Sequence, residues 1–286
     1  MSNQDHREKR PWVSGILWVL AVIIMFTAAG YQERTGPTKE FKGSFQVGGE
    51  KYDYSLIRSG NTDADAPVLI PDPGSGVSGQ VMFKRHPTRD PFTAIPMESL
   101  AGELQGLLPA QPAAGKLEYF VLLETPEGTV RIPQGDDTLI IRYKDPVPLG
   151  VLVPHVICMF LALLIGVRTA LGAFFQPQSV KRLAWTTLAF MTVGGMILGP
   201  IVQKFAFGAF WTGWPFGYDL TDNKTLIMWI VWVGVAFLFW KRPDPRSWLV
   251  RSGIVLAAIV MLGVYVIPHS LRGSELDYDA MEVETG

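Results

Sequence analysis

Five long apolar runs constrain the fold of this chain more than any other feature of its sequence. The first covers residues 12–30, and the other four lie within residues 149–268, separated by short charged connections. Each run has about the ~20 residues that a helix needs to cross the hydrocarbon core of a bilayer. The sequence therefore predicts a membrane protein of mixed α + β class, with an anchor in residues 1–30 and a four-helix transmembrane bundle in residues 149–268.

The charges beside these runs predict an orientation. Basic residues outnumber acidic ones in the segment before the first run and in residues 176–182 and 241–251, whereas the tail at residues 269–286 is acidic. Because basic loops stay in the cytoplasm, we expect a bacterial inner (cytoplasmic) membrane protein with its N-terminus inside and its C-terminus in the periplasm. If the first run were instead a cleaved signal peptide, four spans would remain in the same orientation.

Residues 31–148 have a different texture, with short alternating segments between turns rich in Gly, Pro and Asp. This pattern predicts six or seven strands, and we expect one short helix at residues 97–108. The stretch GKLEYFVLLE, residues 115–124, is similar to the aromatic-bearing F strand of immunoglobulin-like and fibronectin-like domains. That resemblance implies a periplasmic β-sandwich. Its single histidine, His86, has no accompanying nucleophile, so we expect a docking or structural module.

Residues 205–224 form a predicted outer loop that mixes aromatic and charged side chains, as is typical of the headgroup region of a bilayer. Its most prominent aromatic residues are Phe210, Trp211, Trp214, Phe216 and Tyr218. We expect a polar cluster of Lys204, Asp219 and Asp222, in which a salt bridge ties the helix ends to the loop. Thr221 or Asp222 is the expected cap of the next helix. Alternatively, the cluster and His155 line a cavity for a quinone head or an anionic substrate.

Two histidines lie toward the predicted outer ends of different helices. His155 is in the second apolar run, and His269 follows the last one. Two imidazoles at similar depth on facing helices can hold the iron of haem b, so these residues are candidate haem ligands. The ordinary alternative is that His155 hydrogen-bonds a neighbouring helix and that His269 lies at the membrane interface.

His155, Cys158 and Met159 share one face of a helix at spacings of three and four residues. Soft ligands of this kind suit Cu(I), although Cys and Met also fill ordinary helix interfaces. In the same run, Arg168 is expected to extend toward the cytoplasmic headgroups. Gly194 and Gly195 are expected to permit close approach of two helices.

No motif identifies a reaction: the chain lacks a Walker loop, G-x-S-x-G and H-E-x-x-H. A formal net charge of −1 without a basic face argues against nucleic acid as a partner. The sequence therefore favours a non-catalytic docking or stabilising subunit, in contact with the bilayer and with other membrane proteins. An electron-transfer subunit with haem b near a quinone is the second hypothesis, and copper handling is the third.

Overall fold

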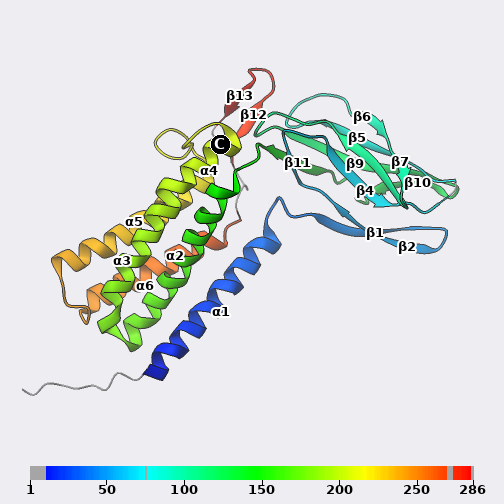
Figure 1. The fold of residues 1–286 in the computed structure, drawn as a ribbon. Helices are drawn as coiled ribbons and strands as arrows, with labels where there is room; N and C mark the ends of the chain where they lie inside the picture. Colours follow the sequence, from blue (N-terminus) through cyan, green and yellow to red (C-terminus); the bar gives the residue numbers. More distant parts are fainter. Residues whose placement is uncertain (1–10, 75, 269–272, 285–286) are drawn as a thin grey trace, which may run out of the picture. The chain divides into compact units, whose positions relative to one another are not determined.

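The chain folds into two compact units (Figure 1). The structure is a computed structural model, and it describes residues 11–74, 76–268 and 273–284. The unit that we call the bundle unit contains the described residues of Met1–Glu33, Leu149–Pro200 and Asn223–Pro268. The unit that we call the β unit contains those of Arg34–Pro148, Ile201–Asp222 and His269–Gly286.

Five helical segments in the described residues are long and apolar enough to cross a membrane, which confirms the predicted number of apolar spans. One of them, Pro177–Phe207, joins several shorter elements end to end. The helices are α1 Pro11–Thr35, α2 Leu149–Phe175, η1 Pro177–Ser179, α3 Val180–Met191, η2 Thr192–Leu198, α4 Gly199–Phe207, α5 Leu220–Lys241 and α6 Trp248–Val266. The first helix continues to Thr35 and is thus longer than the apolar run at residues 12–30 that predicted it.

The bundle unit has one apolar core that all of its long helices share. Helix α1 contributes one face, on which Leu17, Ala21, Met25 and Ala28 are buried at helical spacing. Trp232 of α5 is fully buried within the bundle. Many other large apolar side chains of the helices are exposed, as expected where the surroundings are lipid.

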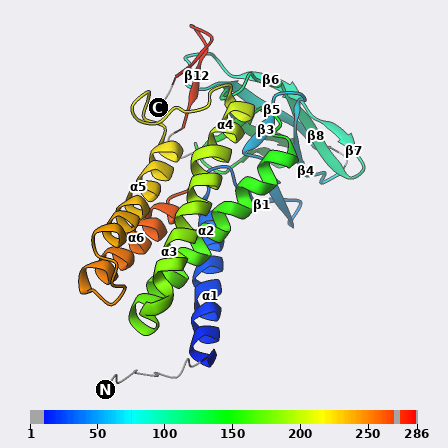
Figure 2. The same ribbon diagram turned by 60° about the vertical axis from the view of Figure 1, so that its left-hand side comes forward.

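Exposed aromatic side chains collect at one end of the bundle unit. Figures 1 and 2 show the start of α1, the α2–α3 turn and the α5–α6 turn at this end. Trp12, Trp240 and Trp248 lie there on three different helices, and each is exposed. The lysines and arginines of residues 176–182 and 241–251 lie in the connections between these helices and in the adjoining helix ends. Tryptophan beside basic residues is the usual composition of a membrane–water interface.

A π-helix, η2, packs closely against α2 through its glycines. A Cβ atom added to Gly194 would lie 2.7 Å from the Cβ of Cys158 and 3.3 Å from the backbone nitrogen of Met159. An added Cβ at Gly195 would lie 2.8 Å from the Cγ2 of Thr225 on α5. The prediction that these two glycines permit close helix approach is therefore confirmed.

We expect Gly194→Ala to destabilise the bundle by about 1–3 kcal/mol, because the new methyl group overpacks a contact that includes backbone. The matched control is Gly234→Ala in α5, where an added Cβ meets nothing within 4 Å. Thermal unfolding of both variants in one detergent measures the difference. A melting temperature that falls equally in the two variants would contradict this account of the helix contact.

The β unit contains several sheets. Its strands are β1 Phe41–Val47, β2 Glu50–Leu56, β3 Ser59–Asn61, β4 Ala66–Pro71, β5 Ser78–Arg85, β6 Thr93–Pro96, β7 Glu98–Leu100, β8 Glu103–Leu108, β9 Lys116–Thr125, β10 Gly128–Ile132, β11 Leu139–Lys144, β12 Glu275–Asp277 and β13 Glu282–Glu284. The largest sheet has the order β3-β11-β9-β5-β6, with β10 also paired to β9. A second has the order β4-β8-β7, while β1 and β2, and β12 and β13, form separate pairs. All of these strand pairs are antiparallel except β3 with β11, which are parallel.

One hydrophobic core lies among the sheets of the β unit. Strand β9 alternates between partly exposed residues and the buried residues Leu117, Tyr119, Val121 and Leu123, which is the two-residue period of a strand. Strands β1, β2, β4, β8 and β11 add buried side chains to the same cluster. The chain therefore combines apolar helices with several β-sheets.

The helix predicted at residues 97–108 is wrong, because this segment forms strands β7 and β8. Ala101 and Gly102 between them have φ angles of 53° and 85°, which make a tight turn in the left-handed region. Along β8 the buried side chains alternate, with Leu104 and Leu108 inside the core. The leucines of this segment recur at spacings that also fit a helix, so periodicity alone was misleading.

Three chain segments make up the β unit, and its second and third segments pair with the sheets of the first. The loop after the third span joins the sheets where the backbone N–H of Asp145 donates to the carbonyl of Ala206, at 3.0 Å. The tail joins where the N–H of Leu276 donates to the carbonyl of Ala114, at 3.2 Å.

Candidate functional site

Residues 208–219, which join α4 to α5, form a loop that we call the aromatic loop. The carboxylate of Asp222 hydrogen-bonds the backbone of this loop. Its Oδ2 accepts hydrogen bonds from the backbone N–H groups of Thr212, at 2.6 Å, and Gly213, at 3.0 Å. The hydroxyl of Thr212 lies 3.3 Å from the same oxygen. Asp222 is only 8% exposed, so a buried charge is compensated by backbone donors of the loop. The loop backbone is therefore fixed by one side chain.

Asp219 has two roles in the same cluster. Its Oδ1 accepts from the backbone N–H groups of Thr221, at 2.8 Å, and Asp222, at 3.3 Å, so it caps the start of α5. Its Oδ2 accepts from the backbone N–H of Ser274, at 3.1 Å, in the C-terminal tail. The predicted cap, Thr221 or Asp222, is two or three residues too late, because the helix begins at Leu220 and Asp219 caps it.

Lys204 does not form the salt bridge that the sequence suggested. Its Nζ donates to the carbonyl of Gly208 and lies 5.6 Å from the ring centroid of Phe210. Among the described residues, no ion pair joins Lys204 to Asp219 or Asp222. The physical reason is that both carboxylates already accept hydrogen bonds from backbone groups of the loop, the helix start and the tail.

Arg142 brings strand β11, the loop and the tail together. Its Nη2 donates to the carbonyl of Ser274 at 2.8 Å, and its guanidinium lies 4.5 Å from the ring centroid of Phe207. Gly273 leaves room for this side chain, since an added Cβ would lie 2.9 Å from Nη1. Burial lowers the pKa of Arg142, and the charges of Asp219 and Glu275 oppose that effect. Sequence reasoning missed both Arg142 and Ser274.

The aromatic side chains of the loop differ in exposure. Trp211 is partly buried, and its indole N–H donates to the carbonyl of Trp214 at 3.0 Å. Phe210, Trp214, Phe216 and Tyr218 are 58%, 65%, 78% and 77% exposed. A backbone fixed by Asp222 therefore presents four large aromatic side chains at the surface of the β unit.

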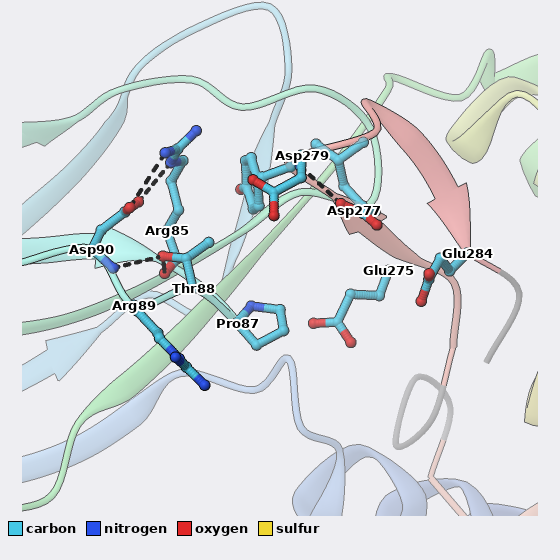
Figure 3. Close-up of a pocket in the computed structure, with 11 residues that line it drawn as sticks. Arg85, Pro87, Thr88, Arg89, Asp90, Glu275, Asp277, Asp279 and Glu284 are labelled. Carbon is cyan, nitrogen blue, oxygen red and sulfur yellow. Dashed lines mark hydrogen bonds and ion pairs between the residues drawn. The ribbon is translucent and has the colours of Figure 1, made fainter.

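A groove of about 520 Å³ lies between the β5–β6 turn and the tail (Figure 3). Its lining includes five carboxylates and two guanidinium groups, of which Arg85 and Asp90 form an ion pair at 2.7 Å. Tyr278 also lines it, and its hydroxyl lies 2.9 Å from the carbonyl of Lys116. Burial raises the pKa of Tyr278. The lining contains no serine, cysteine or histidine.

In the bundle unit, His155 lies against the π-helix. Its Nδ1 is 2.9 Å from the carbonyl of Gly194, which also accepts from the backbone N–H of Gly199. A carbonyl only accepts, so Nδ1 carries the proton and the lone pair of the neutral ring is on Nε2. The predicted haem partner, His269, lies outside the described residues.

Cys158 and Met159 pack against the same π-helix. An added Cβ at Gly194 would lie 2.7 Å from the Cβ of Cys158 and 3.2 Å from the sulfur of Met159. In the part of the chain that the structure describes, no group of three or more His, Cys, Asp or Glu side chains is arranged to hold a metal ion. The three residues of the copper hypothesis therefore share a helix face that also forms a close helix contact.

Comparison with known proteins found no matching family model, no matching curated protein and no matching solved structure.

We expect Asp222→Ala to loosen the aromatic loop, because it leaves two buried backbone N–H groups of the loop without an acceptor. Each such group costs about 1–3 kcal/mol. Limited digestion with chymotrypsin, followed by intact mass measurement, should show faster cleavage within residues 208–218. Asp244→Ala is the matched control, since Asp244 accepts a backbone N–H in an exposed loop of the bundle unit. Equal digestion of wild type and Asp222→Ala would contradict the role given to this carboxylate.

Proposed function

We propose that this protein is a non-catalytic docking subunit of a bacterial inner-membrane assembly, and that its aromatic loop is the contact surface for a partner membrane protein. The observation that carries the proposal is the combination of a fixed backbone with exposed rings. Asp222 holds the loop, while Phe210, Trp214, Phe216 and Tyr218 remain more than half exposed. Loop conformation is thus set before binding, which lowers the entropic cost of association.

The chemistry of the cluster favours docking over catalysis. Asp219 and Asp222 accept hydrogen bonds from backbone N–H groups, so their oxygens hold the fold and are not directed at a substrate. The groove in Figure 3 has a charge pair and no serine, cysteine or histidine in its lining. By contrast, rigid aromatic side chains are the residues that dominate binding energy in protein interfaces.

The distribution of charge supports the proposed orientation. The helix connections at residues 176–182 and 241–251 are basic, which favours the cytoplasm, and the β unit then faces the periplasm. The partner in this proposal is a membrane protein, because the loop directly follows one apolar span and precedes another. We also propose that the sheets of the β unit form an immunoglobulin-like sandwich, supported by the shared core of its strands.

The test compares two triple variants of the full-length protein, extracted from native membranes in a mild detergent. Trp214→Ala/Phe216→Ala/Tyr218→Ala removes the loop rings, while Leu69→Ala/Leu100→Ala/Leu107→Ala removes exposed apolar groups from the sheets. Native gel electrophoresis should show wild type and the leucine variant in a particle larger than the 31.6 kDa chain. The loop variant should migrate alone, since loss of several aromatic anchors costs about 2 kcal/mol or more each. Wild type that migrates as a lone monomer would refute the proposal.

A second candidate is an electron-transfer subunit that binds haem b through His155 and His269, near a quinone at the outer loop. The hydrogen bond from Nδ1 of His155 to Gly194 supports it, because ligand histidines commonly donate their other N–H to a backbone carbonyl. The free nitrogen, Nε2, is also the one that a Cu(I) site with Cys158 and Met159 would use. This candidate ranks second because the chain offers a single ligand pair, without a companion pair at the other face of the membrane.

If haem binds, protein purified after haem-replete expression should show a Soret band, and His155→Ala should lose it or shift it strongly. His86→Ala is the control, since His86 lies in the β unit. Elemental analysis of the same sample separates iron from copper. A sample without a Soret band and without stoichiometric copper would remove both the haem and the copper hypotheses.

A further inference from the structure

Arg168 of α2 is a buried cation that the proposed function does not use. It is 2% exposed, and its guanidinium lies 5.5 Å from a ring of Trp18 on α1. Its Nη2 donates to the side-chain oxygen of Gln176, at 2.7 Å, and to the hydroxyl of Ser14, at 3.2 Å. The side chain thus connects α1 with the end of α2.

Most of the donor capacity of this guanidinium is unused. Nε and Nη1 of Arg168 are buried and have no hydrogen-bond partner in the described residues. A guanidinium has five N–H bonds, so the two on Nη2 are satisfied and the remaining three are not. Nor does any ion pair among the described residues involve Arg168. A buried cation without a counter-charge is rare in membrane bundles and usually marks a functional site.

The side chain reaches the basic end of the bundle unit. Gln176 is the first residue after α2, so the guanidinium lies near the level where that helix ends. Gly172 gives it room, because an added Cβ would lie 2.9 Å from Nη1. Lys181 and Arg182 follow within the next helix, and the guanidinium of Arg251 donates to the carbonyl of Ala173. Such a concentration of positive charge attracts the anionic lipids of a membrane leaflet.

We infer that Arg168 binds the phosphate group of an anionic phospholipid at the end of the bundle where α1 begins and α2 ends. A phosphate has several acceptor oxygens in a compact group, and these match the three N–H bonds that lack acceptors. The phosphate takes the place of the amide of Gln176, which is only partly buried and accepts from Nη2, so that Nη2 and the donors beside it bind one group. Ser14 and the ring of Trp18 then keep the guanidinium in place.

The experiment uses purified full-length protein in a neutral detergent, with melting temperature followed as three probes are titrated. These are short-chain phosphatidylglycerol, short-chain phosphatidylcholine and inorganic phosphate. We expect phosphatidylglycerol alone to raise the melting temperature in a saturable way. In Arg168→Gln the midpoint of this titration should rise at least tenfold, as expected when a charge-assisted pair is lost. In Arg182→Gln, which removes an exposed cation that attracts the lipid without binding its phosphate, the midpoint should rise much less than in Arg168→Gln.

Three outcomes would overturn the inference. An unchanged midpoint in Arg168→Gln would show that other cations bind the lipid. Equal stabilisation by inorganic phosphate would replace the lipid with a soluble anion, and the absence of any effect on wild type would remove the site. If Arg168→Gln does not fold, Arg168→Lys keeps the charge but not the planar donor group, and should weaken binding severalfold. Native mass spectrometry of wild type, which should retain phosphatidylglycerol in preference to phosphatidylcholine, needs no variant.

Discussion

The β unit depends on two buried carboxylates at the start of α5. Asp222 holds the aromatic loop through backbone N–H groups, and Asp219 caps the helix while binding the tail at Ser274. Ser274 is fully buried, and the Asp219 contact joins residues 55 positions apart in the chain. Burial of a carboxylate is costly unless donors surround it, and here the donors come from three different stretches of backbone. Loss of either carboxylate would therefore disconnect segments that meet only in the folded chain.

The helices obey a different constraint. Their backbone polar groups are satisfied within each helix, so the apolar side chains decide how the helices pack. Small residues then set how close two helices come, as Gly194 does against Cys158. The π-helix is part of the same arrangement, since the carbonyl of Gly194 accepts hydrogen bonds from both the backbone N–H of Gly199 and the ring of His155. Backbone geometry and a polar side chain are thus coupled at one point of the bundle unit.

The sequence allowed reliable prediction of features that arise from composition averaged over many residues. The apolar spans follow from runs of about 20 residues, and several β-sheets follow from alternation and turn residues. Local patterns with two interpretations were less informative. Residues 97–108 have leucines that fit either period, and the Ala101–Gly102 turn decided for strands. For the cap of α5, three neighbouring residues were suitable, and the position of the loop selected Asp219.

The candidate site was only partly predictable, because its contacts join distant residues. The contact between Arg142 and Ser274 spans 132 positions, and nothing in the spacing of the chain indicates it. The charge on Asp222 was expected to pair with a lysine, yet backbone N–H groups are nearer and lose less conformational freedom when they bind. Opposite charge in the sequence was therefore a poor guide to partners.

Two buried arginines show how surroundings decide what a charge requires. Arg142 lies in the β unit, where Asp219 and Glu275 act on it electrostatically and Phe207 covers its guanidinium. Arg168 lies in an apolar bundle, where Ser14, Gln176 and Trp18 provide dipoles and a π-face but no negative charge. Dipoles can orient a guanidinium, yet only an anion compensates its charge at low dielectric. The same residue type is thus a structural connection in one unit and an incomplete binding site in the other.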